Sequence, residues 1–422
     1  MAEPVSRAQP QPPRGPAGSV NPVPAEPRSA RLPALDVLRG IAILGTLGTN
    51  IWIFTNGAGL VGYISRNDEP QGVWFWVERA LQQVAQGKFL GLLTIMFGIG
   101  LAIQQRSAVR AGRDWPGPYP WRAGLLLLDG LVNFLFVAEF DVLMGYAVTG
   151  LIVAFILARS PLVQRRWLIA TAAVHLGMLT LLAIGMESSR PKPHSPTPPP
   201  LDPNPYADGS FWDLVVFRVQ HAALFRLEPV FILFLSIALF LLGARLFRAG
   251  VFEPSGARIR KWLMIIGFVV AAPLDLTVGM RGGDLILLTR YGTAPFVALG
   301  ILGLVAHIYT RRPAPGFAGR RLAEVGRMAL SCYILQNLVA GFVCYGWGLG
   351  IASLVSPDSR VLFTLACYLI ISALMLGFAH LWLRRFERGP VEWLWNASYH
   401  ALIRRGSRAT RSAEPAGRWE AG

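Results

Sequence analysis

Residues 33–54 read PALDVLRGIAILGTLGTNIWIF, and this stretch decides the class of fold. Asp36 and Arg39, near its start, are the two residues in it that carry a charge. An α-helix needs about 20 apolar residues to cross the hydrocarbon core of a bilayer. An arginine close to a helix end can extend its side chain to the membrane surface. The stretch therefore predicts a membrane-spanning helix.

Nine further apolar stretches have a similar length, which predicts an all-α, polytopic integral membrane protein with about ten transmembrane helices. The ten segments are 33–54, 88–105, 122–138, 142–158, 166–186, 228–247, 262–280, 291–309, 328–350 and 361–383. The composition agrees, since 53% of the 422 residues are hydrophobic and 15% are charged. Soluble domains carry about 25% charged residues.

Several classes of protein are excluded by the same composition. The apolar content excludes disorder over most of the chain. The three cysteines, Cys332, Cys344 and Cys367, each lie in an apolar run, which is not the pattern of a disulfide framework. No spacing of metal ligands, phosphate-binding glycine loop or serine–histidine nucleophile motif is found, so no metal site is expected.

The chain divides into five parts. Residues 1–31 contain eight prolines and are expected to be a disordered Pro/Arg-rich tail. Two five-helix halves, 32–186 and 228–396, are joined by residues 187–227. This connection is interpreted as a polyproline linker at 190–200 followed by a helix that lies in the membrane interface. Residues 397–422 form a basic tail.

The positive charges predict the orientation in the membrane. With ten crossings both termini lie on one side, and that side carries about 30 of the 40 lysines and arginines. Because basic loops stay in the cytoplasm, both termini are predicted to be cytoplasmic. The net charge of +16 is then explained by topology and by contact with anionic lipids at the cytoplasmic face. Nucleic-acid binding is not expected.

Placing polar groups in the apolar interior of a membrane costs free energy, so such groups usually have a partner or a function. Asp36 and Arg39 are three residues apart and can pair on one helical face, either as a topology anchor or as part of a pocket for an anionic group. Asn50 lies near the far end of the same helix. Glu139 and Asp141 stand in a turn, where two close carboxylates can yield a general base or are simply exposed to water.

The motifs of the chain resemble those of the YeiB-like bacterial inner-membrane proteins. The matching stretches, in the family's order, are LDVLRGIAILG (35–45) with Asn50, Lys88 before FGIG (97–100), Asp141 before Tyr146, GRMALSCY (326–333) with Gln336, YGWGLG (345–350) and GPVEWLW (389–395). The resemblance covers roughly residues 31–396. The part from about 230 onwards resembles the family's domain of unknown function, and the implied location is the bacterial plasma membrane.

The resemblance extends to the transmembrane acyltransferase superfamily. It implies an acyl-CoA donor on the cytoplasmic side, no bound cofactor, and a hydroxyl or amino acceptor on the far side: an envelope sugar, a lipid or a secondary metabolite. In the related bacterial O-acyltransferases a catalytic histidine occupies the place of Asn50.

An acyltransferase is accordingly the leading hypothesis, with four side chains that would bind the substrate or the anionic donor: Asp36, Arg39, Lys88 and Arg327. Asp141 or Glu139 would be the base, and Asn50 and Gln336 would donate hydrogen bonds to the developing oxyanion.

A transporter or exporter of a small amphiphile is the alternative. Glu228–Pro229 opens one helix and Pro273 interrupts another beside Asp275. An acid beside a broken helix is how transporters build ion sites. A non-catalytic membrane protein is the third hypothesis.

Overall fold

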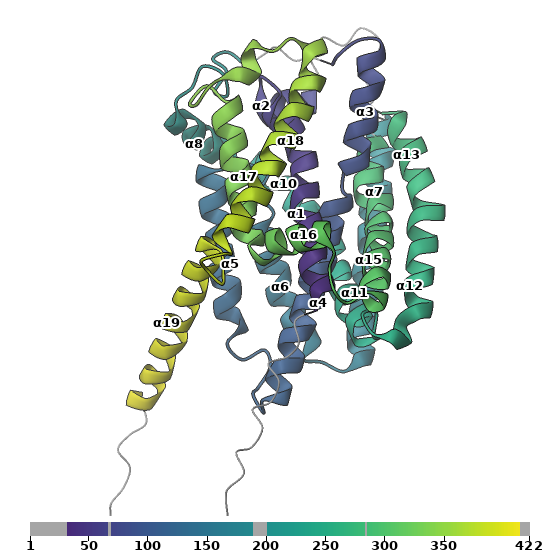
Figure 1. Ribbon diagram of the computed structural model, residues 1–422, viewed down its shortest axis with the longest axis vertical. Coiled ribbons are helices and arrows are strands. Elements are labelled where there is room, and N and C mark those ends of the chain that lie inside the picture. The colour runs from purple at the N-terminus through teal and green to yellow at the C-terminus, as the bar shows by residue number, and fades with distance from the viewer. Residues whose placement is uncertain (1–31, 66–68, 189–200, 283–284, 414–422) are drawn as a thin grey trace, which may run out of the picture. The chain divides into compact units, whose positions relative to one another are not determined.

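The computed structural model describes residues 32–65, 69–188, 201–282 and 285–413. The chain separates into two units, Met1–Leu32 and Pro33–Gly422, and the fold described below is that of the second unit. Its described residues form helices and no strand, as predicted (Figure 1). The predicted tail 1–31 and polyproline linker 190–200 lie outside the described residues. Residues 397–413 of the predicted basic tail belong to the last helix.

The first half of the bundle contains α1 (Pro33–Phe54), α2 (Gly59–Ser65), α3 (Val73–Ala85), α4 (Lys88–Arg110), α5 (Tyr119–Phe136), α6 (Leu143–Leu157) and α7 (Pro161–Ser188). Three short helices follow, α8 (Phe211–Gln220), α9 (Ala222–Phe225) and α10 (Leu227–Phe231).

The second half contains α11 (Leu233–Arg248), η1 (Pro254–Gly256), α12 (Ala257–Met264), η2 (Ile265–Ala271), α13 (Ala272–Met280), α14 (Leu285–Leu288), η3 (Thr289–Thr293), α15 (Ala294–Arg311), α16 (Phe317–Arg327), α17 (Ala329–Cys344), η4 (Ile351–Leu354), α18 (Pro357–Trp382) and α19 (Pro390–Ala413).

Six of the described helices are long and apolar enough to cross a membrane, and eight if each of two bent helix pairs is one span. The bent pairs are Ala222–Phe231 with α11, at 42°, and α16 with α17, at 87°. The predicted segments 122–138 and 142–158 are present as α5 and α6, but α6 has only 15 residues. The structure is thus that of a polytopic helical membrane protein, and the predicted number of ten spans is not reached by these criteria.

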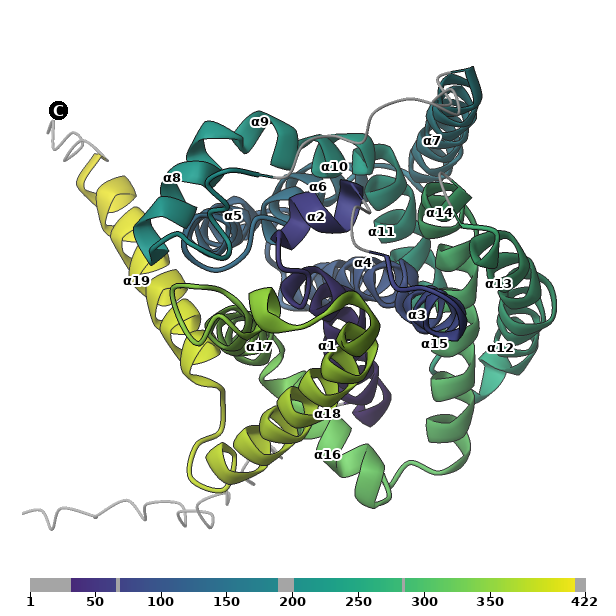
Figure 2. The same cartoon turned by 90° about the horizontal axis from the view of Figure 1, so that it is seen from above.

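Helix α1 lies in the middle of the bundle, where α3, α4, α17 and α18 surround it (Figure 2). Its side chains are apolar nearly all round, and Leu38, Ala42, Leu47 and Phe54 are completely buried. A helix with apolar residues on every side is the kind that a larger bundle encloses. Because α1 is enclosed, any polar group on it faces a neighbouring helix or an internal cavity.

Glycines allow α4 and α11 to touch along their backbones. A Cβ atom at Gly98 would overlap the carbonyl oxygen of Phe240, and one at Gly243 would overlap the carbonyl oxygen of Ile95. Small residues that let two helix backbones approach are typical of packing between membrane helices. These two glycines therefore fix the spacing of α4 and α11.

The two ends of the bundle differ in their loops. At one end, which we call the basic end (105–118, 157–164 and 245–260), the Arg248 guanidinium donates hydrogen bonds to the side chains of Gln164, at 2.6 Å, and Gln105. At the other, the loop end (55–72, 137–142, 201–210 and 345–356), Asn204 Nδ2 donates to the carbonyl oxygen of Gly57 at 2.9 Å. Helix α1 begins toward the basic end and runs to the loop end (Figure 1).

Two helical stretches contain π-helical turns, η2 and η3. Each precedes a proline within the helix that follows, Pro273 and Pro295. A proline cannot donate a backbone hydrogen bond, and its ring collides with the carbonyl four residues earlier in a regular α-helix. A wider π turn relieves that collision. The prolines thus explain why the helices widen at these two places.

Candidate binding pocket

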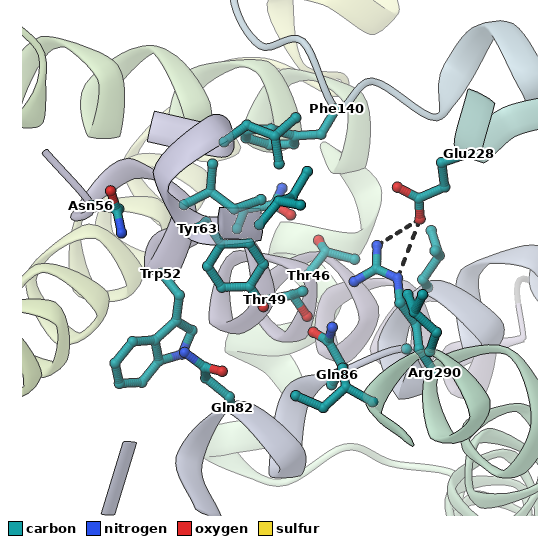
Figure 3. A pocket seen from close by; sticks show the side chains of 18 of the residues that line it. Thr46, Thr49, Trp52, Asn56, Tyr63, Gln82, Gln86, Phe140, Glu228 and Arg290 are labelled. Atoms are coloured by element: carbon teal, nitrogen blue, oxygen red, sulfur yellow. Dashed lines mark hydrogen bonds and ion pairs between the residues drawn. The ribbon is translucent and has the colours of Figure 1, made fainter. Parts of the chain in front are cut away.

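A cavity of about 530 Å³ lies in the loop-end half of the bundle (Figure 3). It is lined by α1, α2, α3, the start of α4, the 140–142 turn, α9, α10, α14 and η3, together with Tyr333 and Arg360. The uncharged polar groups on its wall are Thr46, Thr49, Asn50, Asn56, Tyr63, Gln82, Gln86, Tyr291 and Tyr333. A volume of this size is typical of small-molecule sites. The bundle therefore contains a polar pocket large enough for a small molecule.

An ion pair joins two sides of the pocket. The Arg290 guanidinium donates two hydrogen bonds to Glu228 Oε1, at 2.7 and 3.2 Å. Glu228 is on α10 and Arg290 is on η3, and Figure 3 shows the two side chains meeting beside the cavity. Because η3 is a π turn, the widening before Pro295 helps to place Arg290 on the pocket wall.

Helix α3 contributes a second group of charges. Glu78 lies 3.6 Å from the guanidinium of Arg360 and accepts a hydrogen bond of 2.9 Å from Gln82. Arg79 lies 3.8 Å from Glu69 and stacks 4.3 Å above the ring of Phe75. Charged groups inside a bundle are tolerated when they are paired. Each of the three arginines on the wall, Arg79, Arg290 and Arg360, therefore has a glutamate partner.

Asn50 is the predicted site residue that lines this pocket. Its side-chain nitrogen donates to the side-chain oxygen of Asn337 on α17 at a long distance of 3.5 Å. Asn50 is half-buried, whereas Asn337 is completely buried. The side-chain amide of Asn50 thus projects from α1 and is accessible from the pocket.

The sequence of this chain is similar to one described protein family and to two bacterial proteins. Residues 246–401 match the family described as Protein of unknown function (DUF418). Uncharacterized protein YeiB of Escherichia coli (strain K12) is 28% identical over 388 residues, which cover 86% of this chain and 94% of YeiB. Uncharacterized protein YxaH of Bacillus subtilis (strain 168) is 26% identical over 385 residues, covering 87% of this chain and 94% of YxaH. The chain is therefore similar to these YeiB-like proteins over most of its length.

The family resemblance seen in the motifs is thereby confirmed over nearly the whole chain of this YeiB-like protein. Only some residues of the family motifs line the pocket. Asn50 and Tyr333 do, whereas the FGIG stretch at 97–100 belongs to the contact between α4 and α11.

The two acids of the 139–141 turn lie behind the pocket wall. Glu139 is completely buried and accepts hydrogen bonds from Arg218 Nε, at 3.1 Å, and from the Tyr206 hydroxyl, at 3.0 Å. Asp141 accepts one of 2.8 Å from the side chain of Asn133. Burial raises the pKa of Asp141 to about 6, the main cause being the loss of solvent around its carboxylate. Neither acid lines the large pocket, although Asp141 borders a small void beside it.

Asp36 and Arg39 lie at the beginning of α1 and form the predicted pair, 3.5 Å apart. Neither lines the pocket. Arg327, at the end of α16, donates a hydrogen bond of 3.0 Å to the carbonyl oxygen of Glu387 and is also away from the pocket. These three residues, all predicted to bind the substrate or the donor, therefore lie outside the cavity.

Lys88 takes part in a buried network instead of lining the pocket. Its ammonium group pairs with the carboxylate of Asp275, which also accepts hydrogen bonds from Gln83, at 2.7 Å, and Thr293, at 2.8 Å. Asp275 is 1% exposed, so this network ties α3 and α4 to α13 and η3. A lysine neutralised in this way holds helices together.

Gln336 is completely buried on α17, and neither atom of its side-chain amide has a hydrogen-bond partner among the described residues. It does not line either cavity. The predicted set is thus scattered: Asn50 is at the pocket, the acids and Gln336 are buried nearby in the bundle, and Asp36, Arg39 and Arg327 are elsewhere.

Sequence reasoning missed the charged residues that do line the pocket: Glu69, Glu78, Arg79, Arg290 and Arg360. They stand between the predicted apolar segments and were counted as loop charges. The sequence did hold an indication for Glu228 and Arg290, because a charged residue at the edge of an apolar segment can face the interior of the bundle. Among the described residues, no group of three or more His, Cys, Asp or Glu side chains could hold a metal ion.

Proposed function

We propose that this YeiB-like membrane protein is an acyl-CoA-dependent acyltransferase whose acceptor binds in the 530 Å³ pocket. The position of Asn50 is the observation that supports the proposal. The resemblance places a catalytic histidine of bacterial O-acyltransferases at this position, and here the side chain at that position lines the pocket. The protein is proposed to lie in the bacterial plasma membrane with the pocket facing outward.

The residues of the pocket wall can supply the chemistry. An acceptor hydroxyl would attack the thioester carbonyl, so that a carbon–oxygen bond forms and the carbon–sulfur bond breaks. Glu78 is suited to take the hydroxyl proton, because its carboxylate lines the pocket, where Oε2 lies 3.6 Å from the guanidinium of Arg360. That proton would then pass to the leaving thiolate. The amide of Asn50 would donate a hydrogen bond to the oxyanion.

The donor would approach from the basic end. Arg39 and Thr46 are seven residues apart on α1, which corresponds to about 10 Å along the helix. Thr46 is already part of the pocket wall. A donor held at Arg39 would therefore need to extend its thioester by about that distance to reach the pocket.

The test is an acyl-transfer assay with purified protein in detergent and acetyl-CoA labelled on the acyl group. Wild-type protein is expected to consume the donor, and Asn50→Ala and Glu78→Gln to lower the rate by about 100-fold, in the range of a lost oxyanion donor or base. Asp202→Asn is the matched control, because Asp202 is exposed at the loop end and does not line the pocket. Absence of donor binding and turnover in the wild-type protein would contradict the proposal.

Transport of a small amphiphile is the second candidate, favoured by the π turns and by the Lys88–Asp275 pair beside one of them. Interrupted helices next to buried charges are the construction of many transporter sites. Substrate-dependent counterflow in proteoliposomes, together with no acyl transfer, would favour this function. A protein inactive in both assays would be the non-catalytic membrane protein of the third hypothesis.

A further inference from the structure

The exposed residues of the pocket wall are aliphatic, whereas its polar and charged residues are shielded from solvent. Among the described residues that line the cavity, Ile64, Leu224 and Leu227 are the exposed ones, at 67%, 56% and 61%. They come from α2, α9 and α10, and all three are aliphatic. The polar and charged lining residues are buried or half-buried. The three aliphatic residues therefore form an apolar mouth to a polar pocket.

The apolar mouth continues into an apolar outer surface. Val216 and Val219 on α8 and Val230 on α10 are more than half exposed, as is Trp212 at the start of α8. Exposed aliphatic side chains on a membrane bundle face lipid, and tryptophan favours the level of the lipid headgroups. The mouth thus opens where the bilayer begins.

The charged side chains behind the mouth are largely shielded from solvent. The side chains of Glu228 and Arg290 are 34% and 16% exposed, while those of Arg79 and Arg360 are 14% and 8% exposed. A guanidinium presents a planar set of donors that suits phosphate and carboxylate oxygens. A ligand that passes the mouth would therefore meet three paired arginines, of which Arg360 is the most buried.

We propose that the occupant of the pocket is a membrane amphiphile with an anionic headgroup, which enters head first from the surrounding leaflet. The headgroup exchanges contacts with Arg290, Arg79 and Arg360. The apolar chain stays at the mouth, against Ile64, Leu224 and Leu227. The headgroup then carries the acceptor group for acyl transfer, an assignment that rests on the proposed function.

The first experiment compares three probes by isothermal titration calorimetry with purified protein in a maltoside detergent. The probes are dihexanoyl phosphatidylglycerol, dihexanoyl phosphatidylcholine and sn-glycerol 3-phosphate, which separate the anionic charge from the apolar chain. We expect the phosphatidylglycerol probe to bind at least about tenfold more tightly than either of the others, a difference of about 1.4 kcal/mol. Equal affinity for sn-glycerol 3-phosphate would overturn the proposal.

Two variants of α10 test the mouth. Leu227 and Val230 are similarly exposed, at 61% and 66%, but only Leu227 lines the pocket. Leu227→Asp is expected to weaken binding of the phosphatidylglycerol probe by about tenfold or more, and Val230→Asp by less than about twofold. Equal loss in the two variants, with both eluting as folded protein in size-exclusion chromatography, would contradict entry through this mouth.

Arg290→Gln tests the charge. This variant is expected to reduce the preference for phosphatidylglycerol over phosphatidylcholine to about one, while the phosphatidylcholine affinity stays the same. An unchanged preference would refute the headgroup assignment.

Acyl transfer to a water-soluble sugar alone would overturn this inference and leave the proposed function standing. Tight phosphatidylglycerol binding without acyl transfer to any lipid would contradict the proposed function and leave the inferred binding of an anionic amphiphile standing.

Discussion

At the scale of single residues, the pocket is built from charges that neutralise one another. Arg290 with Glu228, Arg360 with Glu78, and Arg79 with Glu69 are each within 4.0 Å. Burying an ion in a low-dielectric interior is costly unless a partner is close. An anionic ligand therefore competes with a glutamate for each arginine, so these pairs set both the stability of the empty pocket and its selectivity.

The Lys88–Asp275 pair lies outside the pocket and gives a prediction about stability. Lys88→Met leaves the Asp275 carboxylate buried without its cation, and this is expected to lower the free energy of unfolding by about 3–5 kcal/mol. Adding Asp275→Asn removes the charge and keeps one acceptor oxygen, for Gln83 or for the Thr293 hydroxyl, so the double variant is expected to regain at least half of the loss. Unfolding in mixed SDS micelles measures both.

A double variant no more stable than Lys88→Met would show that Lys88 acts on stability through other contacts. Its hydrogen bond to the carbonyl oxygen of Gln83 is the alternative. Lys88→Met should leave binding of an anionic probe within about twofold, because Lys88 does not line the pocket. A large loss of binding would restore Lys88 to the donor role that the sequence suggested.

At the scale of elements, the π turn η3 connects a proline to the pocket. Pro295 follows η3 in the same continuous helical run, and Arg290 and Tyr291 lie within the turn. One residue of a helix corresponds to about 100° of rotation. Closing the π turn to regular α-helix would therefore turn Arg290 away from Glu228.

Pro295→Ala tests this relation. Alanine restores a backbone N–H and removes the collision that favours the π turn, so we expect binding of the anionic phosphatidylglycerol probe to fall by about fivefold to tenfold. Pro357→Ala is the control, because Pro357 lies in the first turn of α18, where proline is tolerated. Unchanged binding in Pro295→Ala would mean that neighbouring contacts, and not the proline, hold Arg290 in place.

Backbone contact between α4 and α11 gives a second prediction for elements. Gly98→Ala adds a Cβ that overlaps the carbonyl oxygen of Phe240, and we expect a loss of about 1–3 kcal/mol in the free energy of unfolding. Gly100, two residues later on α4, has no atom within 4 Å of an added Cβ. Gly100→Ala is therefore expected to be neutral or to stabilise by up to about 1 kcal/mol. The same SDS titration compares the two, and equal effects would contradict the packing.

At the scale of the whole molecule, the apolar runs were enough to predict the helical class, because helix length in a membrane follows from bilayer thickness. They could not predict which helices enclose a pocket. Glu78 and Arg360 are 282 positions apart in the chain, and Glu228 and Arg290 are 62 apart, so their pairing depends on tertiary packing. Asn50 was singled out because a family motif marks it, and the pairing of Lys88 with Asp275 could not be predicted because the two residues lie on helices far apart in the sequence.

The orientation of the bundle decides which solution the pocket faces, and the arrangement of the loops makes it testable. The arginine-rich connections meet at the basic end and the pocket opens at the loop end, so the positive-inside rule predicts an outward-facing pocket. Ser160 is exposed at the basic end and Asp202 is exposed at the loop end. The three native cysteines are buried and give a low background.

In intact bacterial cells, a membrane-impermeant maleimide is expected to label Asp202→Cys and not Ser160→Cys, and permeabilised cells should show labelling of both. The reason is that arginine-rich loops are retained on the cytoplasmic side during insertion. Labelling of Ser160→Cys alone in intact cells would invert the topology. The pocket would then open to the cytoplasm, on the same side as an acyl-CoA donor, and the acceptor would have to come from the inner leaflet.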